Sequence, residues 1–384
     1  MQDKQKTLLV IAGEPSGDAH AAALIEQLRK VYGDLRIFGI GGEALAATGM
    51  EQLYHIKEMA FLGLSEVIKH LPFIRRVQTD LLDRAEKEKP AAAILVDYPG
   101  FNLRMARLLK KRGIPVIYYI SPQLWAWGKR RVKKIQRYVD KMLVVFPFEV
   151  RFYQEHGINA EYVGHPLVDK HAALAPEKIK QIDPRRVTIG LLPGSRRQEV
   201  ENLLPLMVKT ARILHQEKKI HQAEIVKVEH LEKALYDNCL TAHDTFITIT
   251  EKPLYAALPD YDAVFVASGT ATLETGYYGV PMIIVYRVSK LTYFLARYLI
   301  KIDSIGLVNI VAEKKVVSEL IQNEFTPQIA AQEMEYLLIP EKNREIRKEL
   351  AGIRTKLGDP GASYRAAKAV NNFLQNISKE VPNN

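Results

Sequence analysis

The chain has 384 residues, of which 47% are apolar and 26% charged, and it carries a formal net charge of +10. This length and composition predict two soluble globular domains with full cores. The single cysteine, Cys239, excludes an intramolecular disulfide and a metal cluster built on cysteines. The apolar run at residues 7–12 is too short for a signal sequence or a membrane span, and no other stretch reaches spanning length.

Strands alternate with helices along the chain in the order that a parallel α/β sheet requires. In the first half, the predicted strands are residues 8–12, 36–40, 92–97, 116–120, 142–146 and 161–163. The helix-like stretches between them are residues 19–31, 65–87, 103–112, 130–138 and 149–156. The second half predicts a helix at residues 200–216 and strands at residues 187–192, 224–228, 246–250, 263–266 and 282–285.

A polar stretch interrupted by proline separates the two series. It covers residues 169–186, contains no predicted strand, and is interpreted as a linker. The domains on either side are residues 1–168 and 187–360. Two doubly wound domains facing a cleft are the architecture that this order favours.

A basic helix is predicted at residues 129–137, where Lys129, Lys133 and Arg137 recur every four residues beside an apolar stripe that includes Val132. Together with the net charge, it points to an anionic partner. We find no helix-turn-helix signal, zinc spacing or aromatic RNA-binding motif, which disfavours nucleic acid. An anionic membrane surface and a plain solvated basic face are both compatible with this helix.

Ligands of doubly wound sheets bind beyond the carboxyl ends of the strands, so the residues after each predicted strand are candidates for chemistry. After the first strand come Glu14, Ser16 and Asp18. Two carboxylates would repel a pyrophosphate, which favours a sugar or another hydroxyl-bearing substrate, although Ser16 or Asp18 could instead cap the next helix. After the third strand stands Asp97, a candidate general base whose alternative role is a helix cap.

Two loops of the second half are suited to a diphosphate. In residues 192–197, the guanidinium of Arg196 stands beside a glycine turn, and its planar set of donors matches phosphate oxygens. In residues 267–274, a small-residue turn opens a helix whose first N–H groups can bind an anion, and Glu274 can accept bonds from a ribose diol. A tight turn with Ser268 or Thr270 as N-cap is the alternative. These loops place the nucleotide in the second domain and the other substrate in the first.

Residues 61–76 combine an apolar helical face with basic residues near their end. The face suits an interfacial or acyl-chain-binding surface, but a core helix has the same periodicity. The residues we assign to membrane or acyl contact are Phe61, Leu64, Val67, Ile68 and Leu71.

Seven segments, in unbroken order over nearly the whole chain, carry a close resemblance to one family. They are residues 13–18, 96–102, 121–127, 146–149, 163–166, 192–196 and 267–271. They resemble the lipid-A-disaccharide synthase family, which implies a GT-B hexosyltransferase of two Rossmann-like domains facing a cleft. The implied reaction joins UDP-2,3-diacylglucosamine to 2,3-diacylglucosamine 1-phosphate through a β-1,6 linkage, inverting and with loss of UDP, at the cytoplasmic face of the Gram-negative inner membrane.

The resemblance also implies roles for individual residues. Asp97 is expected to be the base, and Gly100 stands where other members carry a second acid, so Asp97 acts alone or with help from elsewhere. A further departure is at residues 226–229, which lack the proline usual at that strand end. The implied donor contacts are Gly194, Ser195, Arg196, Ser268, Gly269, Thr270, Glu274 and Asn309. The implied acceptor contacts are Glu14, Ser16, Gly17 and Asp18.

The partners implied are the two acylated sugars and, peripherally, the anionic inner membrane, without nucleic acid. Residues 361–384 are expected to cross back to the first domain, as GT-B chains do. We expect no cofactor and no metal, because Arg196 and helix N–H groups can stabilise the leaving diphosphate. The acidic motif at residues 260–262 precedes its strand, so it is expected at the amino end of the sheet, away from the cleft. The oligomeric state stays open, with a homodimer as one option. The alternatives are another GT-B enzyme acting on UDP-N-acetylglucosamine, such as a muramyl-pathway transferase or a 2-epimerase, and a basic binding module without catalysis.

Overall fold

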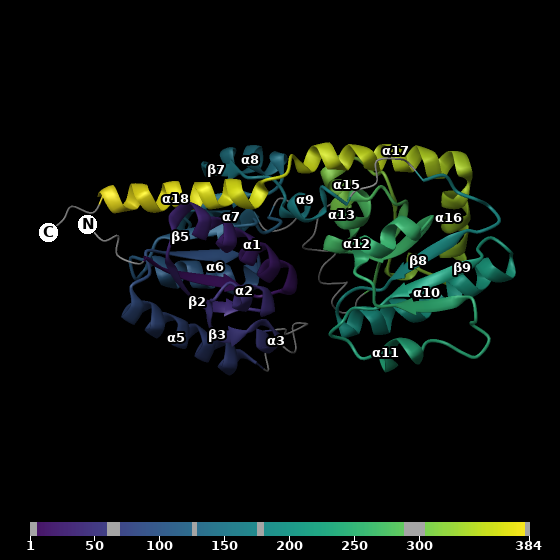
Figure 1. The fold of residues 1–384 in the computed structure, drawn as a ribbon, viewed down its shortest axis with the longest axis horizontal. Coiled ribbons are helices and arrows are strands. Elements are labelled where there is room, and N and C mark those ends of the chain that lie inside the picture. Colours follow the sequence, from purple (N-terminus) through teal and green to yellow (C-terminus); the bar gives the residue numbers. More distant parts are fainter. Residues whose placement is uncertain (1–5, 60–69, 125–128, 175–179, 288–303, 381–384) are drawn as a thin grey trace. The chain divides into compact units, whose positions relative to one another are not determined.

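The computed structural model describes residues 6–59, 70–124, 129–174, 180–287 and 304–380, and it has two compact units, each built on a parallel sheet (Figure 1). Unit 1 comprises Met1–Asp169 with Asp359–Asn384, and unit 2 comprises Lys170–Gly358. The predicted α/β class with two doubly wound sheets is confirmed.

The sheet of unit 1 has seven strands in the order β3-β2-β1-β4-β5-β6-β7. These strands are β1 (Lys6–Ala12), β2 (Leu35–Gly41), β3 (Glu51–His55), β4 (Ala92–Val96), β5 (Val116–Tyr119), β6 (Lys141–Val144) and β7 (Ala160–Tyr162). The described helices are α1 (Pro15–Tyr32), α2 (Glu43–Ala47), α3 (Ile56–Met59), α5 (Leu71–Glu88), α6 (Pro99–Lys110), α7 (Lys129–Tyr138), α8 (Pro147–Gln154) and α18 (Ala362–Glu380). Helix α9 (Pro166–His171) contains the point at which the chain enters unit 2.

Continuous apolar runs form the centre of this sheet because helices cover both of its faces. Every residue of β4 and residues 8–12 of β1 are fully buried. The last helix, α18, packs along α1 although the two lie at opposite ends of the chain (Figure 1). Asp169 fixes the start of α18, since its carboxylate accepts three backbone N–H bonds of 2.6–2.9 Å from residues 361–363.

The sheet of unit 2 has six strands in the order β10-β9-β8-β11-β12-β13. These strands are β8 (Thr188–Leu192), β9 (Gln222–Val226), β10 (Ile247–Thr250), β11 (Ala263–Ala267), β12 (Met282–Tyr286) and β13 (Ser318–Ile321). The described α-helices are α10 (Arg197–Gln216), α11 (Ala234–Asp237), α12 (Leu254–Ala257), α13 (Thr270–Tyr277), α15 (Leu307–Ala312), α16 (Pro327–Leu338) and α17 (Pro340–Leu357). Short 3₁₀ turns occupy Leu258–Asp260 and Gln322–Glu324.

Both sheets change the direction of strand order at one point, between β1 and β4 in unit 1 and between β8 and β11 in unit 2. In open parallel sheets, such a reversal point is where ligands bind, outside the carboxyl ends of the two strands. The loops at residues 13–14 and 97–98 meet at the first of these points. The loops at residues 193–196 and 268–269 meet at the second.

Candidate functional site

Asp97 follows β4 at the reversal point of unit 1, with a half-buried side chain. Its φ is 46° and that of Tyr98 is 48°, so two consecutive residues other than glycine adopt the left-handed conformation. Each such residue costs on the order of 1–3 kcal/mol and persists only where its surroundings enforce it. The predicted base therefore lies on a strained backbone.

Two buried donors enforce this geometry. The Nδ2 atom of Asn102 donates to the backbone oxygens of Val96 at 3.1 Å and of Asp97 at 2.8 Å. The hydroxyl of Tyr118 donates to the same Asp97 oxygen at 2.7 Å. Burial raises the pKa of Tyr118 well above its usual range, so this hydroxyl keeps its proton. Both donors are 0% exposed, and they fix the backbone from which the Asp97 carboxylate extends.

The loop after β1 packs directly against the loop after β4. A Cβ atom at Gly13 would lie 2.2 Å from the ring of Tyr98, so glycine is required at this position. Glu14 is the N-cap residue of α1. Burial, and secondarily the charge of Glu14, raise the pKa of Tyr98 to about 12. The structure thus brings Glu14 and the Asp97 loop together at one edge.

The four predicted acceptor residues divide into two pairs. Glu14 and Ser16 have partly exposed side chains, whereas Gly17 and Asp18 are buried. Asp18 is only 4% exposed, and its carboxylate accepts three backbone N–H bonds of 2.6–3.2 Å from residues 42–45 at the start of α2. Glu14 rather than Asp18 is the N-cap residue of α1, and the oxygens of Asp18 bind the start of α2. A contact of Asp18 with the acceptor stays a prediction.

A buried histidine lies at the same edge, in the segment 163–166 that carries part of the family resemblance, and its position after a predicted strand indicates a residue that lines the cleft. His165 follows β7, is 6% exposed, and has ring neighbours in His20 of α1 at 6.0 Å and Phe146 at 5.3 Å. Its Nδ1 accepts the N–H of Leu167 at 3.1 Å, which assigns the proton of the neutral ring to Nε2. Burial, and secondarily His20, lower the pKa of His165 to about 3, so the ring is neutral at neutral pH.

In unit 2, the Arg196 loop is held in place by Glu199. Gly194 has φ of 105°, and the N–H groups of Ser195 and Arg196 donate to Glu199 Oε2 at 3.0 and 3.2 Å. The guanidinium of Arg196 lies 3.6 Å from the other Glu199 oxygen and is 43% exposed. Since Glu199 occupies the amides, this loop offers an anion its guanidinium rather than its backbone. Glu199 and Arg196 both affect the pKa of Tyr286, which burial raises, so the end of β12 is close by.

The start of α13 matches the predicted anion site better. Gly269 is its N-cap residue, with φ of 155°, and having no side chain it makes no capping hydrogen bond of its own. A Cβ atom at Gly269 would meet no other atom within 4 Å, so the space beside this backbone is open. The first N–H groups of a helix have no acceptor within the helix and carry the positive end of its dipole. Ser268 is instead tied down, with its N–H on Val285 and its hydroxyl on the oxygen of Ile305 at 3.2 Å.

Glu274 lies one turn further along α13, with a side chain that is 18% exposed. Burial raises the pKa of its carboxyl, and the charge of Lys170 opposes that rise. His171 Nε2 lies 3.6 Å from its Oε1 atom. No sequence pattern indicated this neighbour, because His171 is 103 residues away and belongs to the stretch interpreted as a linker.

Asn309 lies in the core rather than at the surface of the donor site. It is 2% exposed, its Nδ2 donates to Val317 O and to Glu319 Oε1, and its Oδ1 accepts the N–H groups of residues 316 and 317, all within 2.8–3.0 Å. Glu319 in turn accepts the N–H groups of Ile305 and Gly306. The amide of Asn309 thus supports the segment that holds Ser268, and its contact with the donor stays a prediction.

Four of the five predicted membrane contacts, Phe61, Leu64, Val67 and Ile68, lie outside the described residues. Leu71 begins α5 and is half-buried, and Arg75 and Arg76 beyond it are exposed. The predicted basic helix is confirmed as α7, since Val132 and Ile135 are 2% and 0% exposed. Among the described residues, no helix is both long and apolar enough to cross a membrane.

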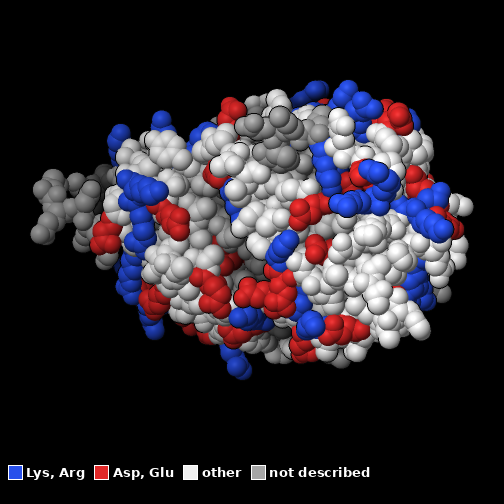
Figure 2. Space-filling model, turned by 45° about the vertical axis from the view of Figure 1, so that its right-hand side comes forward, with Lys and Arg blue, Asp and Glu red and all other residues white. Residues whose placement is uncertain are grey.

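Acidic and basic side chains are interspersed over most of the face drawn in Figure 2. Several basic residues of unit 1 are engaged in ion pairs, such as Arg112 with Glu86 at 2.6 Å and Lys110 with Asp140. Among the α7 residues whose exposure is described, Lys133, Lys134 and Arg137 are exposed cations. Within a mixed surface, α7 therefore gives unit 1 a local run of exposed positive charge.

The amino-terminal edge of the sheet in unit 2 has its own features. Asp262 accepts the N–H of Thr188 at 2.9 Å and pairs with Lys180 at 2.9 Å, so the acidic motif supports the fold.

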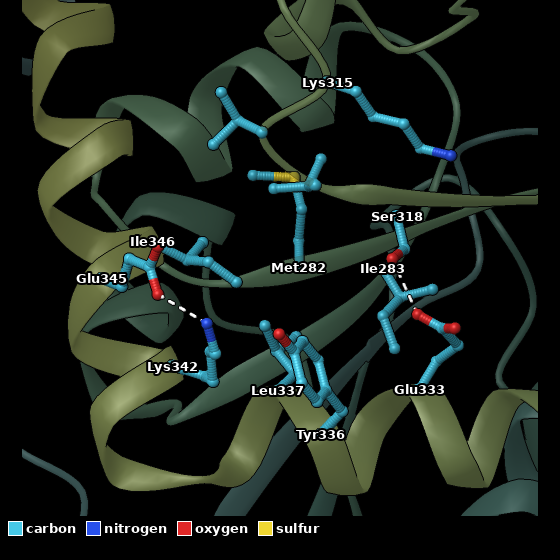
Figure 3. A pocket seen from close by; sticks show the side chains of 12 residues that line it. Met282, Ile283, Lys315, Ser318, Glu333, Tyr336, Leu337, Lys342, Glu345 and Ile346 are labelled. Atoms are coloured by element: carbon cyan, nitrogen blue, oxygen red, sulfur yellow. Dashed lines mark hydrogen bonds and ion pairs between the residues drawn. The ribbon is translucent and has the colours of Figure 1, made fainter.

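A cavity of about 280 Å³ lies at the same edge of the sheet, at the start of β12 (Figure 3). Its polar lining includes the pairs Lys342 with Glu345 and Ser318 with Glu333, and its lining residues are Met282, Ile283, Lys315, Val316, Val317, Ser318, Glu333, Tyr336, Leu337, Lys342, Glu345 and Ile346. In the part of the chain that is described, no cluster of three or more acidic, histidine or cysteine residues could hold a metal ion.

Comparison with known proteins gives a consistent picture. The model of the family described as lipid-A-disaccharide synthetase matches residues 8–373. The lipid-A-disaccharide synthase of Syntrophus aciditrophicus is 43% identical over 368 residues, which cover 94% of this chain and 96% of that protein. The co-structure of MnaA from S. aureus with UDP has a TM-score of 0.65 at 13% identity, covering 97% of this chain and 98% of that chain.

The calicheamicin glycosyltransferase CalG4 has a TM-score of 0.59 at 15% identity, covering 98% of this chain and 100% of that chain. These two structural similarities show the fold, which is the GT-B arrangement of two Rossmann-like units. The nearly complete family match and the 43% identity go further than the fold. On both counts, the chain belongs to the lipid-A-disaccharide synthetase family.

Proposed function

We propose that the chain joins UDP-2,3-diacylglucosamine to 2,3-diacylglucosamine 1-phosphate, forming a β-1,6-linked disaccharide and releasing UDP. The observation that carries this proposal is the family match over residues 8–373. The start of α13 at Gly269, followed one turn later by Glu274, and the fixed backbone of Asp97 agree with it chemically.

The donor binds unit 2 through its nucleotide. The first N–H groups of α13, at Gly269 and Thr270, donate to the diphosphate oxygens, and the Arg196 guanidinium adds a positive charge. Glu274 accepts hydrogen bonds from the ribose hydroxyls. Gly194 and Ser195 shape the turn that presents Arg196, because Glu199 binds the backbone of that turn.

The reaction is a single displacement at the anomeric carbon of the donor. The acceptor 6-hydroxyl attacks that carbon, its proton passes to the Asp97 carboxylate, and the bond to the diphosphate oxygen breaks with inversion. Negative charge grows on the departing UDP, where Arg196 and the start of α13 stabilise it. Glu14 and Ser16 contact the acceptor sugar beside Asp97.

The acylated substrates are used at the cytoplasmic face of the inner membrane, to which the chain attaches peripherally. The exposed cations Lys133, Lys134 and Arg137 of α7 supply electrostatic attraction to anionic lipid. Residues 61–71 add apolar contact with acyl chains. High salt should therefore release only part of the protein from anionic vesicles, since salt screens charge but not apolar insertion.

The test measures UDP release and disaccharide formation with each acylated sugar alone and with both together. We expect equal amounts of UDP and disaccharide, and only when both sugars are present. A parallel reaction with UDP-N-acetylglucosamine should give neither transfer nor 2-epimerisation. UDP release without disaccharide, or epimerisation of UDP-N-acetylglucosamine, would contradict the proposal.

A further inference from the structure

A histidine at the end of α9 is buried among three tyrosines of unit 2. His171 is 2% exposed. The centroid of its ring lies 5.7 Å from that of Tyr255, 6.3 Å from that of Tyr277 and 5.6 Å from that of Tyr278. The residue belongs to neither sheet and to none of the loops described above, so its burial calls for a separate explanation.

Both nitrogens of this ring face polar groups. Nδ1 lies 3.1 Å from the hydroxyl of Tyr278, and Nε2 lies 3.6 Å from Oε1 of Glu274. An ionised carboxylate can only accept, so the proton of the neutral ring belongs on Nε2, and Nδ1 then accepts from Tyr278. Burial lowers the pKa of His171 to about 4, with a smaller contribution from Lys170, so the ring is neutral at neutral pH.

At 3.6 Å the Nε2–H group makes no full hydrogen bond to Glu274, but the positive end of its dipole faces Oε1 in a buried setting, and this attraction favours one rotation of the carboxylate. Each carboxylate oxygen has two lone pairs that can accept hydrogen bonds. To bind a ribose diol, the carboxylate must accept hydrogen bonds from both hydroxyls at the same time. A carboxylate held at a fixed rotation meets that requirement at a smaller entropy cost than a freely rotating one.

We infer that His171 is a positioning residue: held by Tyr278, it orients Glu274 toward the ribose diol and so makes the site selective for ribonucleotides over 2′-deoxyribonucleotides. This inference rests on the proposed function, because it takes Glu274 as the ribose contact. It assigns His171 no direct contact with the substrate. The substrate class that it specifies is a nucleoside diphosphate with both ribose hydroxyls present.

The experiment compares the affinities of the full chain for UDP and 2′-deoxy-UDP by calorimetry. The wild type should prefer UDP by roughly ten- to a hundredfold, the range expected for a hydrogen bond to a charged group. His171→Phe keeps an aromatic ring among the tyrosines but removes both nitrogens. It should reduce the preference to less than about threefold, mainly by weakening UDP, while 2′-deoxy-UDP binds nearly as before.

Tyr278→Phe and Tyr277→Phe form a matched pair of neighbouring positions. The hydroxyl of Tyr278 contacts the histidine, whereas Tyr277 approaches it with its ring. Tyr278→Phe should lower the preference in the same direction as His171→Phe, and Tyr277→Phe should leave it unchanged. Should His171→Phe fail to fold, shown by a lost melting transition, Tyr278→Phe alone decides the matter.

The possible failures are distinguishable. A wild-type preference retained in folded His171→Phe, or in Tyr278→Phe, would overturn the role of His171 while UDP binding and the proposed function stand. Equal affinity of the wild type for the two nucleotides would also overturn the role of His171, because Glu274 would then make no hydrogen bond that distinguishes ribose from 2′-deoxyribose. A wild type that binds neither nucleotide would overturn the proposed function and this inference together.

Discussion

The two sheets place opposite chemistry at the same topological position. In unit 1, the reversal point carries acceptors, since Asp97 sits on a left-handed backbone fixed by buried Asn102 and Tyr118. In unit 2, it carries donors, since the start of α13 has a glycine as its N-cap residue and Arg196 stands on the neighbouring loop. The sheets determine where the loops meet, and a few loop residues determine whether that place presents acceptors or donors.

The largest expected effect comes from removing the acceptor of unit 1. Asp97→Asn should lower turnover by about two to four orders of magnitude, because the amide cannot take the proton of the attacking hydroxyl. UDP affinity should stay near the wild-type value. The exposed carboxylate of Asp83 on α5 provides the control, and Asp83→Asn should leave turnover unchanged. Normal turnover in Asp97→Asn would remove this residue from the mechanism.

The donors of unit 2 should respond differently. Arg196→Ala should lower turnover by roughly a hundredfold, with a smaller loss in UDP affinity, because the charge that it stabilises grows during departure. Arg197 is the matched control, since it is 51% exposed and pairs with Glu201 and Glu232. Arg197→Ala should change turnover by less than about twofold. A loss in UDP affinity as large as the loss in turnover would show that Arg196 acts in ground-state binding instead.

The buried histidine of unit 1, His165, should make the unfolding free energy depend on pH. In the folded chain, the pKa of His165 is about 3, whereas in the unfolded chain it is about 6.5. Between these two pH values, the unfolded state therefore binds more protons than the folded state. The unfolding free energy therefore falls as pH falls through this window, by about 2 kcal/mol at pH 5 from this residue alone.

Denaturant unfolding of unmodified chain and of His165→Gln, measured from pH 8 to pH 4.5, tests this slope. The variant should be less sensitive to acid, because glutamine does not titrate. Exposed His243 serves as the control, and His243→Gln should retain the full slope. If the unfolding free energy depends on pH equally in all three proteins, His165 is protonated in the folded chain.

Sequence patterns predicted the central strands well because these strands are buried on both faces. All residues of β4 and β11 are apolar and at most 5% exposed, so each reads as an uninterrupted run. The outer strands β3 and β13 went unpredicted, since Glu51–His55 and Ser318–Ile321 mix polar with apolar residues. A strand of such mixed composition is recognised by what pairs with it, and that information lies elsewhere in the chain.

The candidate site shows the same limit. The position of Asp97 was predictable because it ends an apolar run. The structural roles of Asp18 and Asn309 were not predictable from sequence. Each is a polar residue in a helix, Asp18 in α1 and Asn309 in α15, and most of its partners are backbone groups brought near by folding, 24–27 residues away for Asp18. His171 is more remote still from Glu274. Spacing locates a loop, but only packing tells which of its side chains are already bonded.

The smallest expected effect separates a structural from a substrate-facing residue within the first turn of α1. Asp18→Ala leaves three backbone N–H groups at the start of α2 without their acceptor and should lower the unfolding free energy by about 1–3 kcal/mol. The KM for the acceptor should not change. Ser16→Ala, two residues earlier and partly exposed, should raise that KM by about threefold to tenfold without affecting stability. Thermal unfolding and acceptor titrations on both variants decide between the roles, and a raised KM with normal stability in Asp18→Ala would return this carboxylate to the acceptor site.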